Sequence, residues 1–279
     1  MVAALQDRFR SYPTELLLNL TLRELRGKFK RSALGWLWSV INPIANIAIY
    51  SLVFGVFLNL GSNPPVGDPS GLSAYWLFLV AGLLPWTFFA TALGACTGSV
   101  VANESLVKKV YFPRKVLPAA SVAAAVTTFG VELLVFGVVL AIAGNVVLWW
   151  IPLILLLIAL HACFVLGIGF ALSSLNAYFR DVQHFLAIFL NIWFYATPIL
   201  YPASRIPEHV SFLGTQLPLG KIMALNPMAV FISAYRNLLY DLRSPSLGHW
   251  AALAAGSITV LLIGRAIFNR FEPRLAEVL

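Results

Sequence analysis

Long segments with almost no charged residues constrain this chain more than any other feature of its sequence. A helix needs about 20 apolar residues to cross the hydrocarbon core of a bilayer. We expect six membrane-spanning helices, at about residues 38–60, 72–101, 116–143, 147–173, 185–201 and 250–268. The composition agrees, because 11% of the residues are charged, against about 25% in a typical soluble domain. The sequence therefore predicts an all-α, polytopic membrane protein.

The basic residues between these segments predict the orientation of the chain. The N-terminal region carries seven Lys or Arg, the connection after the second segment four, the connection after the fourth one and the C-terminal region three. The other four lie in the long connection before the last segment. Because Lys and Arg concentrate in cytoplasmic connections, both termini are expected in the cytoplasm. Bases beside membrane segments also indicate anionic lipid, and not nucleic acid, as their partner.

A basic amphipathic helix is predicted just before the first segment, over residues 14–31. Its apolar stripe consists of Leu18, Leu22, Leu25 and Phe29. Its basic stripe consists of Arg23, Arg26 and Lys30. Such a helix is suited to lie in the membrane interface. A surface helix of a soluble domain is the alternative, and the apolar segment that follows argues against it.

A short helix is predicted in the long connection, residues 202–248. Asn226 and Pro227 are typical of a helix start. The apolar face behind them contains Met228, Phe231, Ile232, Tyr235, Leu238 and Leu239. Roughly 14 residues are too few to cross a bilayer, so we expect a re-entrant or interfacial helix. A second short helix is expected earlier in the same connection.

No motif indicates that this chain carries out a chemical reaction by itself. The stretch nearest to a phosphate-binding loop, Gly214–Lys221, has five residues between its glycines instead of four, and no Ser or Thr follows. The His and Cys residues lack metal-ligand spacing, so neither a metal site nor a catalytic residue is expected. Glu132 lies within the third segment, where a charge costs about 2.5–3.5 kcal/mol. We favour a structural hydrogen bond for Glu132 over a proton relay, because a relay needs further ionisable partners.

Several motifs, in order along the chain, resemble those of one transport family. They are RGKFKRSALGWLWSVINP, GLLPWTFF, LVKKVYFPRKVLP, YFRDVQH, WFYATPILYP and NPMAVFISAYRNLL. With this set the chain resembles the permease subunits of type-2 ABC exporters for polysaccharides, which include O-antigen, capsule and teichoic acid exporters. The resemblance covers nearly the whole chain from about residue 14. It departs at Lys115, where the family often has an acid.

The resemblance implies a dimer of six-span subunits that works with two separate ATPase subunits. ATP and Mg are then bound by the ATPase, so this chain is expected to hold no cofactor and to be no enzyme. The implied function is ATP-driven export of a polysaccharide linked to undecaprenyl diphosphate, such as O-antigen, across a bacterial inner membrane.

Other functions have less support in the sequence. A type-2 exporter of a small lipid or drug is the first alternative, and a membrane-embedded glycan-lipid transferase is the second. The transferase needs a polar catalytic cluster near one interface, which we do not find. A secondary transporter needs paired intramembrane charges and an internal repeat, and the sequence has neither.

Two sites are expected at the cytoplasmic side. The lipid diphosphate is expected to bind Lys28, Lys30 and Arg31, although attraction to anionic lipid and topology explain these bases equally well. The resemblance implies that the loop after the second segment is a coupling helix that docks on the ATPase. The candidate contacts are Glu104, Lys108, Lys109, Tyr111, Phe112 and Arg114. A basic loop that only sets topology is the alternative.

A path for the glycan is expected along aromatic rings, because they offer sugars an amphipathic surface. The candidates are Tyr50, Phe54, Trp86, Phe88, Phe89, Trp193, Phe194 and Tyr195. Many of these rings fit a belt at the membrane interface instead. The connection 202–248 is interpreted as a gate at the exit.

Overall fold

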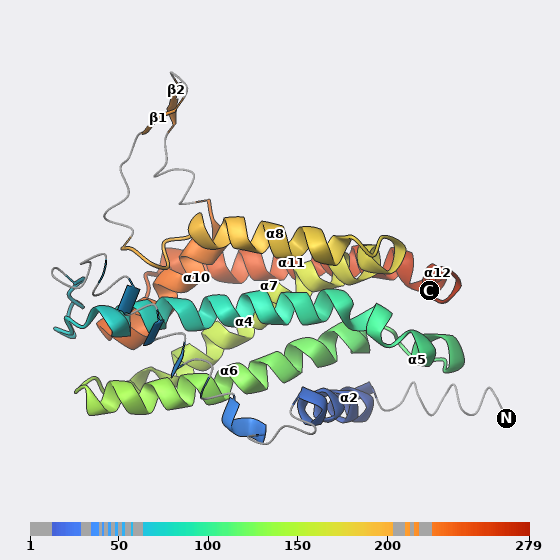
Figure 1. Cartoon of the computed structure of the whole chain (residues 1–279), viewed down its shortest axis with the longest axis horizontal. Coiled ribbons are helices and arrows are strands. Elements are labelled where there is room, and N and C mark those ends of the chain that lie inside the picture. The colour runs from blue at the N-terminus through green and yellow to red at the C-terminus, as the bar shows by residue number, and fades with distance from the viewer. Residues whose placement is uncertain are drawn as a thin grey trace.

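The chain forms a bundle of helices in a computed structural model (Figure 1). The structure describes residues 13–28, 35–38, 64–202 and 225–279, isolated residues between 41 and 57, and two short strands within 210–217. Apart from these strands, the described elements are helices, so the predicted all-α class is confirmed in this coarse form. More than half of the first predicted membrane segment, residues 38–60, lies outside the described residues.

Four described helices are long and apolar enough to cross a membrane. They are α4 (Tyr75–Ala102), α6 (Val116–Ile142), α7 (Ile151–Tyr178) and α11 (Leu247–Phe271), with the turn η4 (Leu148–Trp150) leading into α7. These helices match four of the predicted segments, and α7 continues beyond the predicted end at residue 173. At about 1.5 Å per residue they exceed the hydrocarbon thickness of about 30 Å. The chain is therefore built as a membrane protein.

The helix α8 (Val182–Tyr195) is shorter than the segment predicted at 185–201. It has 14 residues, or about 21 Å at 1.5 Å per residue, which is less than the hydrocarbon thickness. The helix ends just before Pro198, which has no backbone N–H to continue the helical hydrogen bonds. The prediction is therefore wrong for the last six residues of the segment, 196–201, where apolar residues continue but the helix does not.

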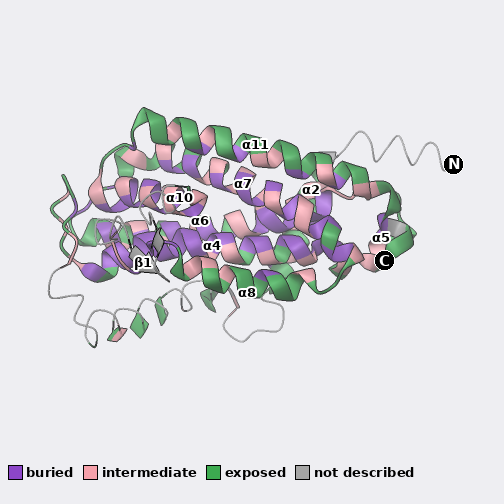
Figure 2. Ribbon diagram, turned by 90° about the horizontal axis from the view of Figure 1, so that it is seen from above, coloured by how far each residue is buried: buried purple, intermediate pink, exposed green. Residues whose placement is uncertain are grey.

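The core of the bundle is built around α4. In its most apolar stretch 78% of the residues are buried, against 22–33% in the other three long helices. The helices α6, α7, α8 and α10 (Pro227–Arg236) contact it, and Figure 2 shows the exposed residues on the outer faces of α8 and α11. Those faces expose large apolar side chains such as Phe185, Ile188 and Ile263. Such extended apolar surfaces fit a lipid environment better than water.

The helices α7 and α11 approach each other most closely at two glycines. A Cβ on Gly264 would overlap the carbonyl of Gly167, and a Cβ on Gly167 would lie 2.6 Å from the backbone of Val260 and Leu261. Small residues allow this close backbone contact between helices in membranes. The two glycines therefore fix the spacing of this helix pair.

The short helix predicted before the last span is present as α10 (Pro227–Arg236), which the π-helical turn η6 (Asn237–Asp241) continues. The Asn226 side chain caps it by accepting a hydrogen bond from the backbone N–H of Met228 at 3.0 Å. All six residues of the predicted apolar face are buried. The second short helix is not found at 210–217, where β1 (Val210–Phe212) and β2 (Thr215–Leu217) pair as antiparallel strands.

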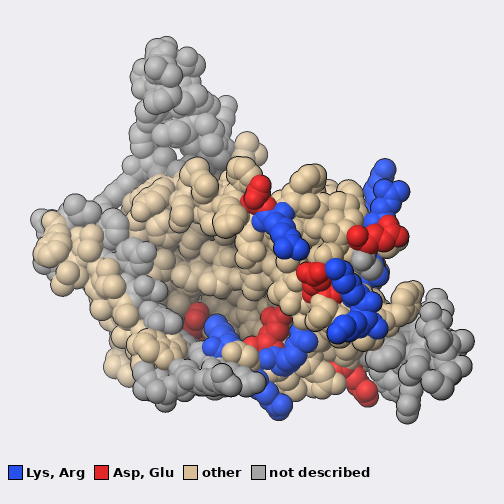
Figure 3. Space-filling model, turned by 45° about the vertical axis from the view of Figure 1, so that its right-hand side comes forward, with Lys and Arg blue, Asp and Glu red and all other residues tan. Residues whose placement is uncertain are grey.

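The two ends of the bundle differ in charge. The helices α2 (Pro13–Lys28), α5 (Glu104–Lys109) and α12 (Leu275–Val278) lie at one end with the C-terminus, and the turn η7 (Glu272–Arg274) joins α11 to α12. Among the residues drawn in colour, Figure 3 shows Lys, Arg, Asp and Glu gathered toward this end. We call it the charged end, and we call the opposite one, where α10 lies, the α10 end.

Candidate functional site

The helix α2 is attached to α6 by a face that the predicted apolar stripe did not include. Leu20 is buried in a cluster with Leu117 and Ala120, and Ser121 donates a hydrogen bond to the Glu24 carboxylate at 2.8 Å. Burial raises the pKa of Glu24, whereas the Ser121 hydrogen bond and the charge of Arg23 act to lower it. A polar contact therefore fixes the rotation of α2 about its axis.

The predicted stripe forms a second, outward surface of α2. Leu18 is 60% exposed and Leu22 is 38% exposed, whereas Leu25 is buried. Arg23 and Arg26 are exposed as well. Exposed leucines beside bases are the arrangement expected of a helix in a membrane interface.

The candidates for the lipid headgroup are only partly described. Lys30 and Arg31 lie outside the described residues. Lys28 is exposed, but it lines a cavity together with Glu24 and Glu132. At about 100° of helix rotation per residue, Lys28 lies on a different side of α2 from Arg23 and Arg26. The structure therefore does not place Lys28 in one basic stripe with these arginines.

The coupling candidates divide into an exposed group and an inward group. In α5, Lys108 forms an ion pair with Glu104 at 2.6 Å, and Arg180 lies 3.8 Å from the same carboxylate. The hydrogen bond and the charge of Lys108 lower the pKa of Glu104. Lys109 and Tyr111 are exposed, and Tyr111 is 73% exposed. The exposed candidates therefore form a charged surface with one protruding ring.

Phe112 and Arg114 are used within the chain. Phe112 is 6% exposed and packs in the cluster that contains Leu20 and Val107. The backbone N–H of Arg114 donates to the Glu272 carboxylate at 2.9 Å, and its guanidinium donates to the backbone carbonyls of Glu272 and Pro273. These two residues therefore fasten the corner between α5 and α6 to the C-terminal segment.

A cluster between α4 and α8 is formed by four of the described aromatic candidates, Trp86, Phe89, Trp193 and Phe194. The Trp86 ring lies 6.2 Å from Trp193 and 5.6 Å from Phe194, measured between centroids. Phe89 is fully buried. The Phe88 ring stacks on Phe129 at 4.7 Å.

Exposure separates these rings into packed ones and accessible ones. The three candidates of α4 are buried, at 5% or less. Tyr195 is 70% exposed, and Trp193 and Phe194 are half-buried. The rings of α4 thus pack the core of this chain, and Tyr50 and Phe54 lie outside the described residues.

Arg236 is a buried cation, although the sequence analysis counted it among the bases of an outer connection. It is 8% exposed, and its guanidinium donates hydrogen bonds to the carbonyls of Pro198, Ile199 and Phe78. The central guanidinium carbon, Cζ, also lies 3.7 Å from the centroid of the Phe78 ring. A Cβ at Gly82 would come within 2.5 Å of the guanidinium, so this glycine makes room for it.

The bonds of Arg236 connect α10 to α4 and to the chain after α8. The signal in the sequence was a single base beside the apolar face of a helix too short to cross a membrane. Periodicity alone did not show where this base would lie.

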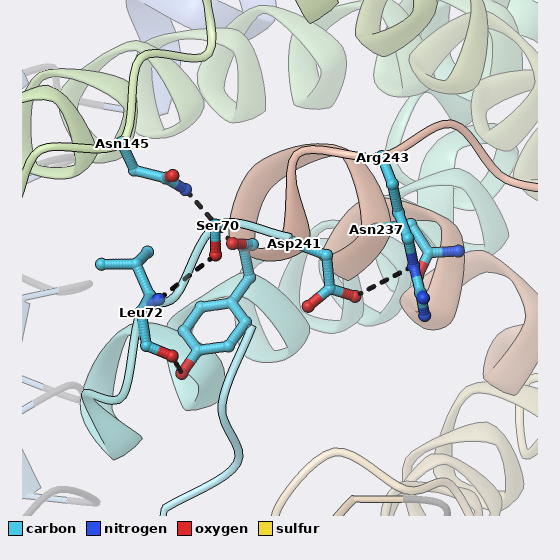
Figure 4. A network of polar contacts seen from close by, with 7 residues as sticks. Ser70, Leu72, Asn145, Asn237, Asp241 and Arg243 are labelled. Atoms are coloured by element: carbon cyan, nitrogen blue, oxygen red, sulfur yellow. Dashed lines mark hydrogen bonds and ion pairs between the residues drawn. The ribbon is translucent and has the colours of Figure 1, made fainter. Parts of the chain in front are cut away.

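Polar contacts also close the α10 end (Figure 4). The hydroxyl of Tyr240 lies 2.6 Å and 2.8 Å from the carbonyls of Pro65 and Leu72. The Asn145 amide donates to the carbonyls of Leu239 and Tyr240, at 2.8 Å and 3.2 Å. The turn η6 is thereby fastened both to the segment before α4 and to the turn after α6.

A family model described as ABC-2 type transporter matches residues 15–240. This chain belongs to that family. It is 30% identical over 262 residues to the O-antigen export system permease protein RfbA of Myxococcus xanthus, which covers 94% of both chains. It is also 30% identical to a protein of the same name from Klebsiella pneumoniae, over 96% of both chains. The polysialic acid transport protein KpsM of Escherichia coli is 26% identical over 92% of this chain and 93% of its own length.

Membership of the ABC-2 family confirms the resemblance seen in the ordered motifs. The chain is the membrane subunit of a transporter and not an enzyme. ABC-2 permeases work together with ATP-binding cassette subunits, so the charged end and the α10 end belong to one part of a larger assembly.

We predict that replacement Arg236→Gln lowers the stability of this ABC-2 permease. The shorter glutamine amide cannot donate hydrogen bonds to all three carbonyls that Arg236 contacts. Each buried polar group left without a partner costs about 1–3 kcal/mol. The thermal unfolding of the purified chain in detergent, followed by circular dichroism, measures the effect.

Arg243→Gln is the control for this replacement. The Arg243 side chain is 53% exposed and lies 3.6 Å from Asp241, and exposed ion pairs contribute only about 0–1 kcal/mol. Equal unfolding temperatures for the two variants would show that the buried contacts of Arg236 do not stabilise the bundle.

Proposed function

We propose that this chain is the membrane-spanning subunit of an ATP-driven exporter of lipid-linked polysaccharide. The substrate is a glycan such as O-antigen on undecaprenyl diphosphate, moved from the cytoplasmic to the outer side of a bacterial inner membrane. The observation that carries this proposal is similarity over almost the full length to permeases named for O-antigen export. A relative named for polysialic acid transport also belongs to the polysaccharide class.

In this proposal the chain forms half of the transmembrane pore. A second copy completes the pore, and two separate ATPase subunits bind ATP and Mg, so this chain holds no cofactor. Residues 1–279 act as one transmembrane domain of six spans with both termini in the cytoplasm. The gathering of charged residues at the end that holds α2, α5 and α12 supports this orientation.

The exposed surface of α5 is the proposed contact with the ATPase. Lys108, Lys109 and Tyr111 face outward there, while Glu104 connects α5 to Arg180 in the α7–α8 connection. Phe112 and Arg114 act within the chain and hold α5 in place. Closure of the ATPases then moves α5 together with the end of α11, because Arg114 is bonded to Glu272.

The proposed roles of the remaining candidates follow the direction of transport. Lys28, Lys30 and Arg31 attract the anionic headgroup at the charged end. Residues 202–248, which include α10, gate the exit, and Trp193, Phe194 and Tyr195 contact glycan near it. Export of a small lipid or drug is the alternative within the family, and the names of the relatives favour a polysaccharide.

Deletion of the gene in its native bacterium tests the proposed function. We expect surface polysaccharide to disappear and lipid-linked glycan to accumulate inside the cell, with both changes reversed by the gene on a plasmid. Surface polysaccharide is measured by antibody or lectin staining, and the intracellular glycan by extraction and gel analysis. Unaltered surface polysaccharide in the deletion strain would contradict the proposal.

We predict that Tyr111→Ala and Phe112→Ala have opposite consequences. Loss of the exposed Tyr111 ring should weaken co-purification with the ATPase about tenfold, which corresponds to about 1.4 kcal/mol of binding free energy. The unfolding temperature of this variant should stay unchanged. Loss of the buried Phe112 ring should cost about 3–5 kcal/mol of stability.

The ATPase pull-down and thermal unfolding of the permease separate the two effects. If Tyr111→Ala retains the ATPase as the unmodified chain does, the assignment of this ring to the contact is wrong.

A further inference from the structure

A cavity of about 580 Å³ opens between α2, α4 and α6. Its volume lies within the range of about 300–1,000 Å³ found for small-molecule sites. A second hollow of about 440 Å³, nearer the charged end, shares Glu24, Ala95 and Ser121 with it. The two hollows therefore form one groove along α4. We call it the α4 groove.

One wall of the α4 groove is rich in hydrogen-bond acceptors. The hydroxyls of Thr87, Thr91 and Thr128 donate to backbone carbonyls of their own helices, at 2.9, 2.7 and 3.2 Å. Because a hydroxyl has one donor and two acceptor positions, these side chains present acceptor positions to a ligand. The carboxylates of Glu24 and Glu132 also line the groove and add acceptors.

Another part of the groove is apolar and partly aromatic. The Phe88 ring, stacked on Phe129, lies there with Val80, Leu83 and Leu84. Phe88 is the one ring among the predicted glycan contacts that lines the groove within the described part of the chain. Sugars have hydroxyl edges and apolar C–H faces, so a site with both kinds of wall matches their surface.

The charges of the groove distinguish between possible ligands. The described lining residues include two acids, Glu24 and Glu132, and one base, Lys28. A diphosphate or an acidic sugar would meet like charge in the groove, which is unfavourable at low dielectric. A lipid tail has no donors for the free acceptor positions of the threonines and carboxylates, which is unfavourable where water is excluded. An uncharged, hydroxyl-rich ligand avoids both problems.

We propose that the α4 groove binds uncharged sugar units of the exported glycan. The diphosphate then stays outside the groove. This inference rests on the proposed function and deepens it, because it names neutral sugars as the class that the permease accepts at this position.

Filling the groove tests the inference in living cells. Thr91→Leu and Thr128→Leu each place a branched apolar side chain in it. Surface polysaccharide in the complemented deletion strain is expected to fall about tenfold, the effect of losing about 1.4 kcal/mol of binding. ATPase co-purification and the unfolding temperature are expected to stay unchanged.

Thr127→Leu is the matched control. Thr127 is the neighbour of Thr128, makes the same kind of hydrogen bond to its helix at 3.0 Å, and is exposed outside the groove. Export by this variant is expected to equal that of the unmodified chain. Equal export by the Thr91 and Thr128 variants would overturn the inference.

A second measurement works on the folded transporter and so avoids folding defects. Thr91→Cys is introduced into a chain with Cys96→Ala and Cys163→Ala, which removes both native cysteines. The permease with its ATPase is reconstituted in proteoliposomes and treated with a neutral methanethiosulfonate reagent. We expect labelling to inhibit glycan transport, and a neutral oligosaccharide cut from the native polysaccharide to slow labelling, whereas sialic acid should not. The inference would be contradicted if labelling also inhibited transport by an identical Thr127→Cys preparation, or if the neutral oligosaccharide did not slow labelling of Thr91→Cys.

The tests separate this inference from the function on which it rests. If deletion abolishes surface polysaccharide but the filled-groove variants export normally, the α4 groove is not a sugar site and the exporter assignment stands. If deletion leaves surface polysaccharide unaltered, the proposed function itself is wrong.

Discussion

The cost of placing a charged group in hydrocarbon, about 2.5–3.5 kcal/mol at the centre of a helix, determines how this bundle is organised. The described charges gather at the end that holds α2, α5 and α12. Two of the charged residues away from that end, Arg236 and Glu132, are compensated locally. Arg236 uses three backbone carbonyls and the Phe78 ring, and Glu132 lies in a polar groove with Lys28.

Different polar contacts hold the two ends of the bundle together. At the charged end, polar contacts join α2 to the end of α4 through Arg23 and Asn103, and the C-terminal segment to the corner after α5 through Arg114. At the α10 end, Arg236 bonds α10 to the chain after α8, and Tyr240 bonds η6 to the segment before α4. The central helix α4 spans the distance between these two sets of contacts.

The sequence predicted those elements that depend on length, apolarity and capping. The spans α4, α6, α7 and α11 follow from uncharged length, and α10 follows from the Asn226 cap with its apolar face. The predicted fifth span was too long because apolar residues continue past Pro198, where the backbone cannot remain helical.

The features that the sequence did not predict depend on contacts between residues that lie far apart along the chain. Periodicity identified two stripes on α2, but the contact with α6 uses a third face that includes Leu20 and Glu24. The motif around Phe112 and Arg114 indicated a shared role, yet burial separates these residues from the exposed Tyr111. The α4 groove combines side chains from three helices, so no local pattern in the sequence contains it.

The proposed contact between α5 and the ATPase requires the charged end of the bundle to face the cytoplasm. Labelling of single cysteines with a membrane-impermeant maleimide tests it most directly, in a chain with Cys96→Ala and Cys163→Ala. Ser105 and Ser244 are both exposed, in α5 and just after η6 respectively. The account predicts that Ser244→Cys is labelled in intact spheroplasts and that Ser105→Cys is labelled only after lysis. Labelling of both positions from the same side of the membrane would contradict it.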